Sequence, residues 1–351
     1  MKKNLAFIIT LTALIGTLSG CSGVEEMSNS VSENSGISNF TSDQGMISSD
    51  FNITNDQNIT SAKCYKVDFQ EVTEDQVAAL FKAVPQKETN EFGRTVFNGE
   101  KENGSLSPSS GVGGSGTYYI VMYWTEQGDK YDSAAYRNYS EIAVKRDLSF
   151  LTSAEAEEEI KSLLSGFMPT GVSVKAYAIS EEYYSQYAKE QPVKDKEDAD
   201  FWGEKYTEKD YGTAADYYYF TIEQTVDGIP IQAELIGNLD TGSQTWGSEA
   251  SAVLSEEGLG YLRVFSPYKI TGEIEVSEKF ITFSEAEQMF RDKNDSFLTT
   301  EDITVNYSRL VYVVLRAEDN GLVLTPAWEF KYNDKLFFRV NAYTGEEIVT
   351  V

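Results

Sequence analysis

The stretch LVLTPAWEFKYNDKLFFRVNAYTGEEIVTV, residues 322–351, decides the fold of the second half of this chain. From Leu322 onward apolar residues alternate with more polar ones, a period of two that is typical of strands with one buried face. One face carries Leu322, Leu324, Pro326, Trp328 and Phe330, and the other carries Thr325, Ala327, Glu329 and Lys331. We therefore expect the first face to be core and the second to face water.

Turn signals on both sides of this strand predict how its neighbours run. Asn320-Gly321 precedes it and is a strong hairpin signal, and Asn333-Asp334 turns the chain again after it. A further strand follows, with Leu336, Phe338, Val340 and Ala342 on the core side. Together with a strand over 310–316, these segments predict an antiparallel meander packed on a helix at 284–293.

Three aromatic residues of this terminus are candidates for either core or binding: Trp328, Tyr343 and Phe337. Trp328 lies on the apolar face, which favours burial. An exposed tryptophan that anchors a partner is the competing interpretation.

A repeated motif lies upstream of the meander. Residues 150–157, FLTSAEAE, match residues 280–287, FITFSEAE, at five of eight positions. Each copy is followed by a helical pattern, at 154–167 and 284–293, and then by a strand pattern, and the shared Thr suits a helix N-cap. Duplication and independent convergence on the same capping residues both explain the match.

The other expected elements are strands over 63–69, 117–125, 217–226 and 229–235, a helix over 75–83 with a capping box at Thr73 and Gln76, a loop over 98–116, and a charged solvated stretch over 194–200. They predict an α+β fold of antiparallel sheets packed by few helices. Length suggests an N-terminal domain at 61–200 and a C-terminal domain at 201–351.

The first 60 residues predict export and anchoring. Lys2 and Lys3 precede a short apolar run, which is the pattern of a signal peptide over residues 1–20. Leu18-Ser-Gly-Cys21 resembles the lipobox of bacterial lipoproteins, which implies that Cys21 is lipidated. Residues 21–60 are rich in Ser and Asn, and residues 22–60 contain no Lys or Arg, so we expect a disordered tether. The expected location is the outer face of the bacterial cytoplasmic membrane.

The net charge and the cysteine content limit the possible binding partners and disulfide bonds. The formal net charge of −27 repels nucleic acid and anionic lipid surfaces, so no nucleic-acid partner is expected. Once Cys21 is lipidated, Cys64 is the remaining cysteine and no intramolecular disulfide can form. Cys64 is either a buried small hydrophobe, which we favour, or a reactive thiol.

Catalytic and metal-binding motifs are weak. The chain contains no histidine, which removes Ser-His-Asp and Cys-His catalysis and His-ligated zinc. Residues 111–116 fit G-x-G-x-x-G but lack the strand before and the helix after that a dinucleotide site needs. Residues 292–303 begin like a calcium loop, but Phe297 and Ile303 stand where a Gly and a Glu are required. We expect no cofactor, no metal and no enzymatic activity.

Several motifs within residues 215–351 resemble those of known protein families. The motifs ITFSEA at 281–286, TPAWEF at 325–330 and VNAYTGE at 340–346 resemble the PepSY-like module and the C-terminal half of YycH/YycI regulatory proteins from Gram-positive bacteria. YFTIEQTVDGIPI at 219–231 is similar to the hairpin that precedes PepSY modules in metalloprotease propeptides. The resemblance implies a module that binds or restrains a protease, a sensor ectodomain or a peptide.

The sequence therefore predicts a lipid-anchored module that binds a membrane or secreted protein, or a peptide. The alternative is cell-wall glycan binding or carboxylate-based glycan hydrolysis, for which the 56 acidic residues and the tyrosines Tyr206, Tyr211, Tyr217 and Tyr219 are the candidates. Tyrosines also suit half-buried strands, and we favour that interpretation of these four.

Overall fold

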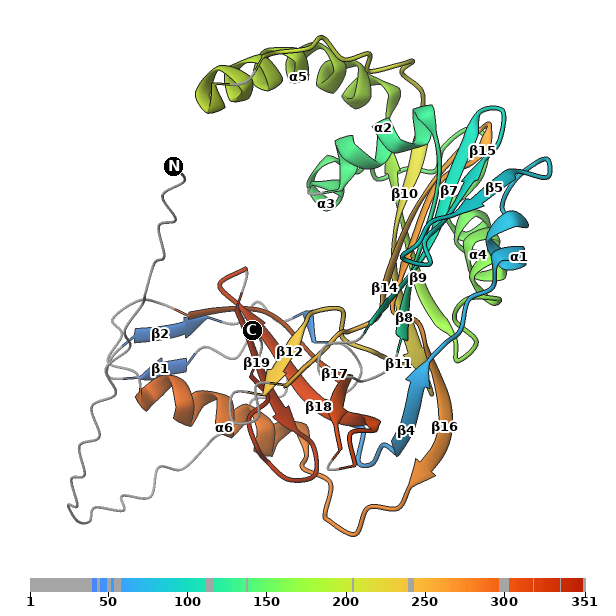
Figure 1. The fold of residues 1–351 in the computed structure, drawn as a ribbon. Coiled ribbons are helices and arrows are strands. Elements are labelled where there is room, and N and C mark those ends of the chain that lie inside the picture. The colour runs from blue at the N-terminus through green and yellow to red at the C-terminus, as the bar shows by residue number, and fades with distance from the viewer. Residues whose placement is uncertain are drawn as a thin grey trace, which may run out of the picture. The chain divides into compact units, whose positions relative to one another are not determined.

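The computed structural model describes residues 40–42, 45–48, 52–53, 58–110, 117–136, 138–203, 205–238, 243–296, 303–317, 319–334 and 336–349. The described residues form one compact unit, and residues 1–39, including the predicted lipidation site Cys21, lie outside them. The unit is built from two large sheets whose main strands are antiparallel, with helices packed on them (Figure 1), which confirms the predicted α+β class.

The first sheet, called the meander sheet here, contains the predicted C-terminal strands. They are β17 (Ile303–Arg316), β18 (Leu322–Tyr332) and β19 (Leu336–Asn341), joined by β4 (Cys64–Phe69) and β16 (Tyr268–Ile274). β18 pairs with β17 along one edge, and its other edge is shared by β4 and β19. The short strands β2 (Gly45–Ser48) and β3 (Asn52–Ile53) pair with β17 in parallel, and β1 (Phe40–Ser42) pairs with β2. These three strands lie within the predicted tether.

The second sheet has nine strands and draws them from both predicted domains. Its order is β11-β10-β14-β15-β8-β7-β6-β5, with β9 on the other edge of β10. The strands are β5 (Gln86–Thr89), β6 (Thr95–Asn98), β7 (Glu102–Ser110), β8 (Thr117–Thr125), β9 (Val172–Ile179), β10 (Tyr217–Val226), β11 (Ile229–Pro230), β14 (Glu249–Ser255) and β15 (Gly258–Phe265).

A short third sheet pairs β12 (Ile236–Asn238) with β13 (Ser243–Thr245). The boundary predicted at residue 200 does not separate the two large sheets. β4 precedes residue 200 yet lies in the meander sheet, whereas β15 follows it and pairs with β8. The reason is that strand pairing joins distant segments, and residue patterns along the chain do not carry that information.

The helices in the described residues are α1 (Glu74–Ala78), α2 (Glu126–Ala135), α3 (Tyr139–Ile142), α4 (Ser153–Leu164), α5 (Glu181–Trp202) and α6 (Phe283–Ser296). Local signals place three of them, α1, α4 and α6, whereas α2, α3 and α5 were not predicted. The capping box predicted at Thr73 is present, and α1 is shorter than the predicted 75–83. Both copies of the repeated motif also use their shared threonine as a cap: the Oγ1 of Thr152 accepts from the Glu155 amide, and that of Thr282 accepts from the Glu285 amide.

The loop predicted over 98–116 is wrong, whereas the stretch 194–200 is solvated as expected but helical. The loop expected over 98–116 contains β7, which pairs with both β6 and β8. An added Cβ at Gly104 would lie 3.0 Å from the Met122 carbonyl oxygen and 3.1 Å from the Phe81 ring, so this glycine allows close packing. The charged stretch over 194–200 lies inside α5, which crosses it as a continuous helix.

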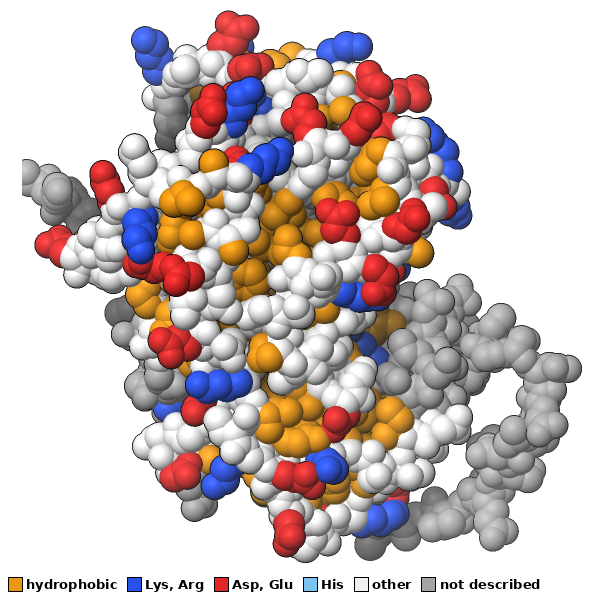
Figure 2. Space-filling view, turned by 90° about the vertical axis from the view of Figure 1, so that its right-hand side faces the viewer, with side chains coloured by type: hydrophobic (Ala, Val, Ile, Leu, Met, Phe, Trp, Pro, Cys, Tyr) orange, Lys and Arg blue, Asp and Glu red, His pale blue; other side chains and the backbone are white. Residues whose placement is uncertain are grey.

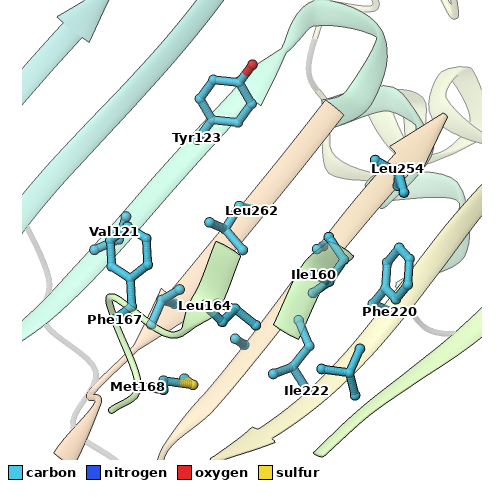
Figure 3. Packing of buried hydrophobic residues seen from close by; sticks show 14 of the residues in the cluster. Val121, Tyr123, Ile160, Leu164, Phe167, Met168, Phe220, Ile222, Leu254 and Leu262 are labelled. Atoms are coloured by element: carbon cyan, nitrogen blue, oxygen red, sulfur yellow. The ribbon is translucent and has the colours of Figure 1, made fainter. Parts of the chain in front are cut away.

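The nine-stranded sheet has a core on each face. On one face α4 packs on β9 and β10, and its fully buried Ile160 and Leu164 join side chains of β8, β14 and β15 in one cluster (Figure 3). On the other face α2 and α5 pack on a tyrosine-rich cluster, in which the rings of Tyr131 and Tyr217 stack with their centroids 4.3 Å apart. The sheet is therefore buried on both faces over much of its area.

The meander sheet packs on α6, as predicted. The Phe290 ring of α6 stacks on Phe330 of β18 with centroids 5.1 Å apart, and the Phe283 ring meets Trp328 edge-on at 5.5 Å. The opposite face of β18 was expected to face water, but Ala327 and Glu329 are both fully buried there. Ile236 and Ile348 cover Ala327, so segments outside the meander close this face. None of the helices in the described ranges combines the length and the apolar character needed to cross a bilayer.

Candidate functional site

Trp328 is a core residue. Its side chain is fully buried, and its indole Nε1–H donates to the carbonyl oxygen of Ile281 at 2.7 Å, which satisfies its polar atom. It contacts the rings of Phe280 and Phe283 edge-on. An exposed anchor for a partner is therefore excluded for Trp328 in this conformation.

Tyr343 also has a structural role, and so does Cys64. The half-buried Tyr343 donates its hydroxyl hydrogen to the carbonyl oxygen of Ala62, which ties the chain before β4 to the residues after β19. The Cys64 thiol is buried, and burial raises its pKa to about 11. A thiol with that pKa stays protonated and unreactive at neutral pH, which agrees with the interpretation of Cys64 as a small hydrophobe.

Phe337 lies on a different kind of surface. It is half-buried and belongs to a cross-strand row formed by Tyr307 of β17, Lys331 of β18 and itself on β19, called the aromatic row here. The Nζ of Lys331 lies 5.8 Å from the Tyr307 ring centroid and 5.7 Å from that of Phe337. Both distances are within cation–π range, so the two rings hold the lysine between them. Alternation along the strands places this row on the face opposite Trp328.

Next to the aromatic row on the same face lies a buried charged row of Arg309, Glu329 and Arg339. The Nε of Arg309 donates to Oε1 of Glu329 at 2.9 Å, and the Nε of Arg339 donates to Oε2 at 2.6 Å. Burial alone would raise the pKa of Glu329, but Arg339 and Arg309 outweigh it and lower that pKa. Glu329 is thus held ionised in the interior.

Two further glutamates extend the charged row to segments outside the meander sheet. Glu223 of β10 accepts from Arg309 at 2.6 Å, and Glu234 accepts from Arg339 at 2.6 Å. Three carboxylates therefore meet two guanidinium groups. This network ties β10 of the nine-stranded sheet to β17 of the meander sheet.

Among the described carboxyl groups, Asp132 has the most strongly raised pKa. In α2, Gly128 lies so close to β15 that an added Cβ would be 1.9 Å from the Gly260 carbonyl oxygen. The absence of a side chain here lets the helix pack closely on the sheet. Asp132, one turn later, has an Oδ1 atom with no hydrogen-bond partner among the described residues. Burial, reinforced by the charge of Asp129, raises the pKa of Asp132 to about 7.

Two of the four tyrosines considered for sugar binding are buried and cannot stack on a sugar. Tyr217 and Tyr219 are buried in the cluster beneath α2 and α5, which agrees with their interpretation as strand residues, while Tyr206 and Tyr211 are partly exposed. Within the described ranges, no group of three or more Cys, Asp or Glu side chains is arranged to hold a metal ion. The segment 111–116 with its glycine pattern lies outside the described residues.

The sequence missed the charged row because each of its members has the pattern of an ordinary exposed strand residue. The available signal was their register: the residues lie at matching positions of three consecutive strands joined by tight turns. Exposed hydrophobic side chains are common on this molecule and do not by themselves mark a site. Figure 2 shows such patches on one face, with acidic and basic side chains between them.

The fold has a counterpart among solved structures. The crystal structure of an uncharacterised protein from Eubacterium rectale matches with a TM-score of 0.60 and 17% identity, over 90% of this chain and 94% of that one. The C-terminal domain of YpeB from Bacillus megaterium matches with a TM-score of 0.31 and 12% identity, over 80% of this chain and 99% of that one. No protein-family model and no curated protein matches the sequence. The chain thus shares its fold with the protein from Eubacterium rectale.

Proposed function

We propose that this chain is a non-catalytic binding module held at the outer face of the bacterial cytoplasmic membrane by a lipid on Cys21, with a protein or peptide as its ligand. The resemblance of residues 215–351 to PepSY and YycH/YycI proteins supports this class of function. The predicted signal peptide and lipobox support the location.

The observation that carries the proposal is the aromatic row. Tyr307 and Phe337 are half-buried rather than core, and Lys331 between them bridges the two rings. Aromatic residues next to buried, fully paired charges are the composition of binding hot spots, because such residues lose little conformational freedom on binding. The charged row beside it links the three strands through side-chain ion pairs, so the surface is preorganised for a ligand.

The same geometry argues against acid–base catalysis at this face. A general acid or base must exchange its proton with a substrate within hydrogen-bond reach. Glu329 is fully buried, and its two oxygens are already bonded to Arg309 and Arg339. Its lowered pKa also keeps it ionised at neutral pH, so it cannot act as an acid there.

A cross-linked capture from native membranes tests the proposed site. The change is Phe337→Ser combined with Lys331→Ser, and the matched control is Leu336→Ser, an exposed neighbour whose side chain points to the other face of β19. We expect the double variant to lose the captured protein or peptide while keeping its melting temperature, and the control to retain it. Capture of wall glycan in place of protein would favour the alternative function, and equal capture by all three chains would exclude this surface.

The anchor is tested separately with Cys21→Ala. We expect this variant to leave the membrane fraction or to accumulate as the unprocessed precursor. A mature, shortened chain that still sediments with membranes would contradict lipidation at Cys21.

A further inference from the structure

The helix α5 has two unlike parts. Its first turns pack on the tyrosine-rich cluster, where Tyr184 is fully buried and donates its hydroxyl hydrogen to the carbonyl oxygen of Tyr211 at 2.5 Å. Ser180 caps its N-terminus by accepting from the amide of Tyr183. Beyond Ala188, the side chains of the helix are exposed or half-buried, and none is buried. The second part therefore gains little from the core that holds the first.

The exposed part ends in an aromatic pair. Phe201 and Trp202 are 78% and 73% exposed, and their rings meet edge-on with centroids 5.0 Å apart. Gly203 follows in the left-handed conformation with φ of 68° and ends the helix, so the pair occupies the last turn. Val193, two turns earlier, is 59% exposed as well. Large apolar side chains this exposed and this close together are typical of interaction surfaces.

Acidic side chains surround this pair. Between residues 190 and 202 the helix carries Glu190, Asp195, Glu197, Asp198 and Asp200 against two basic residues, Lys194 and Lys196. Asp195 is already held by Lys209 at 2.7 Å and by the hydroxyl of Tyr211, whereas Glu197, Asp198 and Asp200 are exposed. The turns around the aromatic pair therefore have a negative field.

That field selects among the possible occupants. An anionic lipid surface would be repelled by the acidic turns, and so would a second copy of a chain whose net charge is −27. A protein surface with an apolar pocket bordered by Lys or Arg would be attracted, and its pocket would take the indole and phenyl rings out of water.

We propose that the last turns of α5, with Phe201 and Trp202 as anchors, dock into an apolar pocket of a partner protein that is bordered by basic side chains. This surface is distinct from the aromatic row, and the proposal holds whether or not that row binds a ligand.

Site-specific photo-cross-linking in the cells that make the protein tests this. A photoreactive phenylalanine analogue replaces Phe201 in the full chain, and in a matched control it replaces Phe92, which is equally exposed at 78% in a hairpin turn. We expect a discrete adduct with one protein from position 201 and none from position 92. The partner peptide in that adduct should contain Lys or Arg.

Two further changes in the chain labelled at 201 sharpen the test. Trp202→Ala should reduce the adduct at least tenfold, and Asp198→Lys combined with Asp200→Lys should do the same by inverting the local charge. Both variants should keep the melting temperature of the parent chain, because the changed side chains are exposed. The proposal is overturned if position 201 gives no adduct, if it cross-links to lipid or to a second copy, or if charge inversion leaves the yield unchanged.

Discussion

The C-terminal meander and the end of α5 both place a tryptophan among charged residues, with opposite results. Trp328 alternates with polar residues along β18 and is fully buried, because α6 and the neighbouring strands cover its face. Trp202 follows a run of acidic residues and is 73% exposed, because no described element covers the last turns of α5. The difference shows that an aromatic residue is buried only where another segment packs on it. Alternation along β18 indicates such a packed face, whereas the acidic run before Trp202 indicates none.

The largest effect expected from this comparison is that of Trp328→Ala. Removing a buried indole should lower the free energy of unfolding by about 3–5 kcal/mol, since it leaves a cavity and an unpaired carbonyl oxygen at Ile281. Denaturant unfolding of the purified full chain measures the change. An unaltered midpoint would show that the face of β18 toward α6 does not hold the fold together.

The charged row offers the next test, on the opposite face of the same strand. Glu329→Gln removes the charge between Arg309 and Arg339 but leaves each arginine one outer glutamate. We expect a loss of free energy of unfolding of about 3 kcal/mol, at the lower end of what breaking a buried ion pair costs. The control is Glu273→Gln, whose exposed pair with Lys63 is screened by water, so this change should alter the free energy of unfolding far less.

Asp132 gives a smaller effect whose sign depends on pH. Its folded-state pKa of about 7 lies above the ordinary value of 3.8, so the native state binds its proton more tightly than the unfolded state. The contribution of protonated Asp132 to the free energy of unfolding is fully present below pH 3.8. It is lost as the pH rises through about 7. Asp132→Asn, which stays neutral, should therefore stabilise the protein by about 1–2 kcal/mol at pH 8 and by much less at pH 4. Equal melting shifts at both pH values would contradict the buried position of this carboxyl.

The smallest effect completes the comparison. Trp202→Ala should change the free energy of unfolding by no more than about 0.5 kcal/mol, because the indole is already in water. Trp328→Ala, measured in the same unfolding experiment, provides the buried tryptophan for comparison. A loss above 1 kcal/mol at Trp202 would mean that this side chain packs on the protein in solution.

Much of the secondary structure could be predicted because its signals are local. The capping threonines Thr73, Thr152 and Thr282 each lie next to the helix they begin, and a cap acts over three or four residues. The alternation in β18 likewise identified the side that meets α6. The candidate site could be predicted only in part: Phe337 was a candidate, whereas Lys331 was assigned to a solvated face and the charged row was missed.

Sequence by itself determined the α+β class, the C-terminal meander and the starts of α1, α4 and α6, since each rests on residues close together in the chain. Only the tertiary structure decided that β4 joins the meander sheet, that Glu329 is buried between two arginines, and that the end of α5 is left uncovered. The physical reason is that strand pairing and burial depend on which distant segments meet. The local sequence around a strand glutamate is the same whether its side chain faces water or lies between two guanidinium groups.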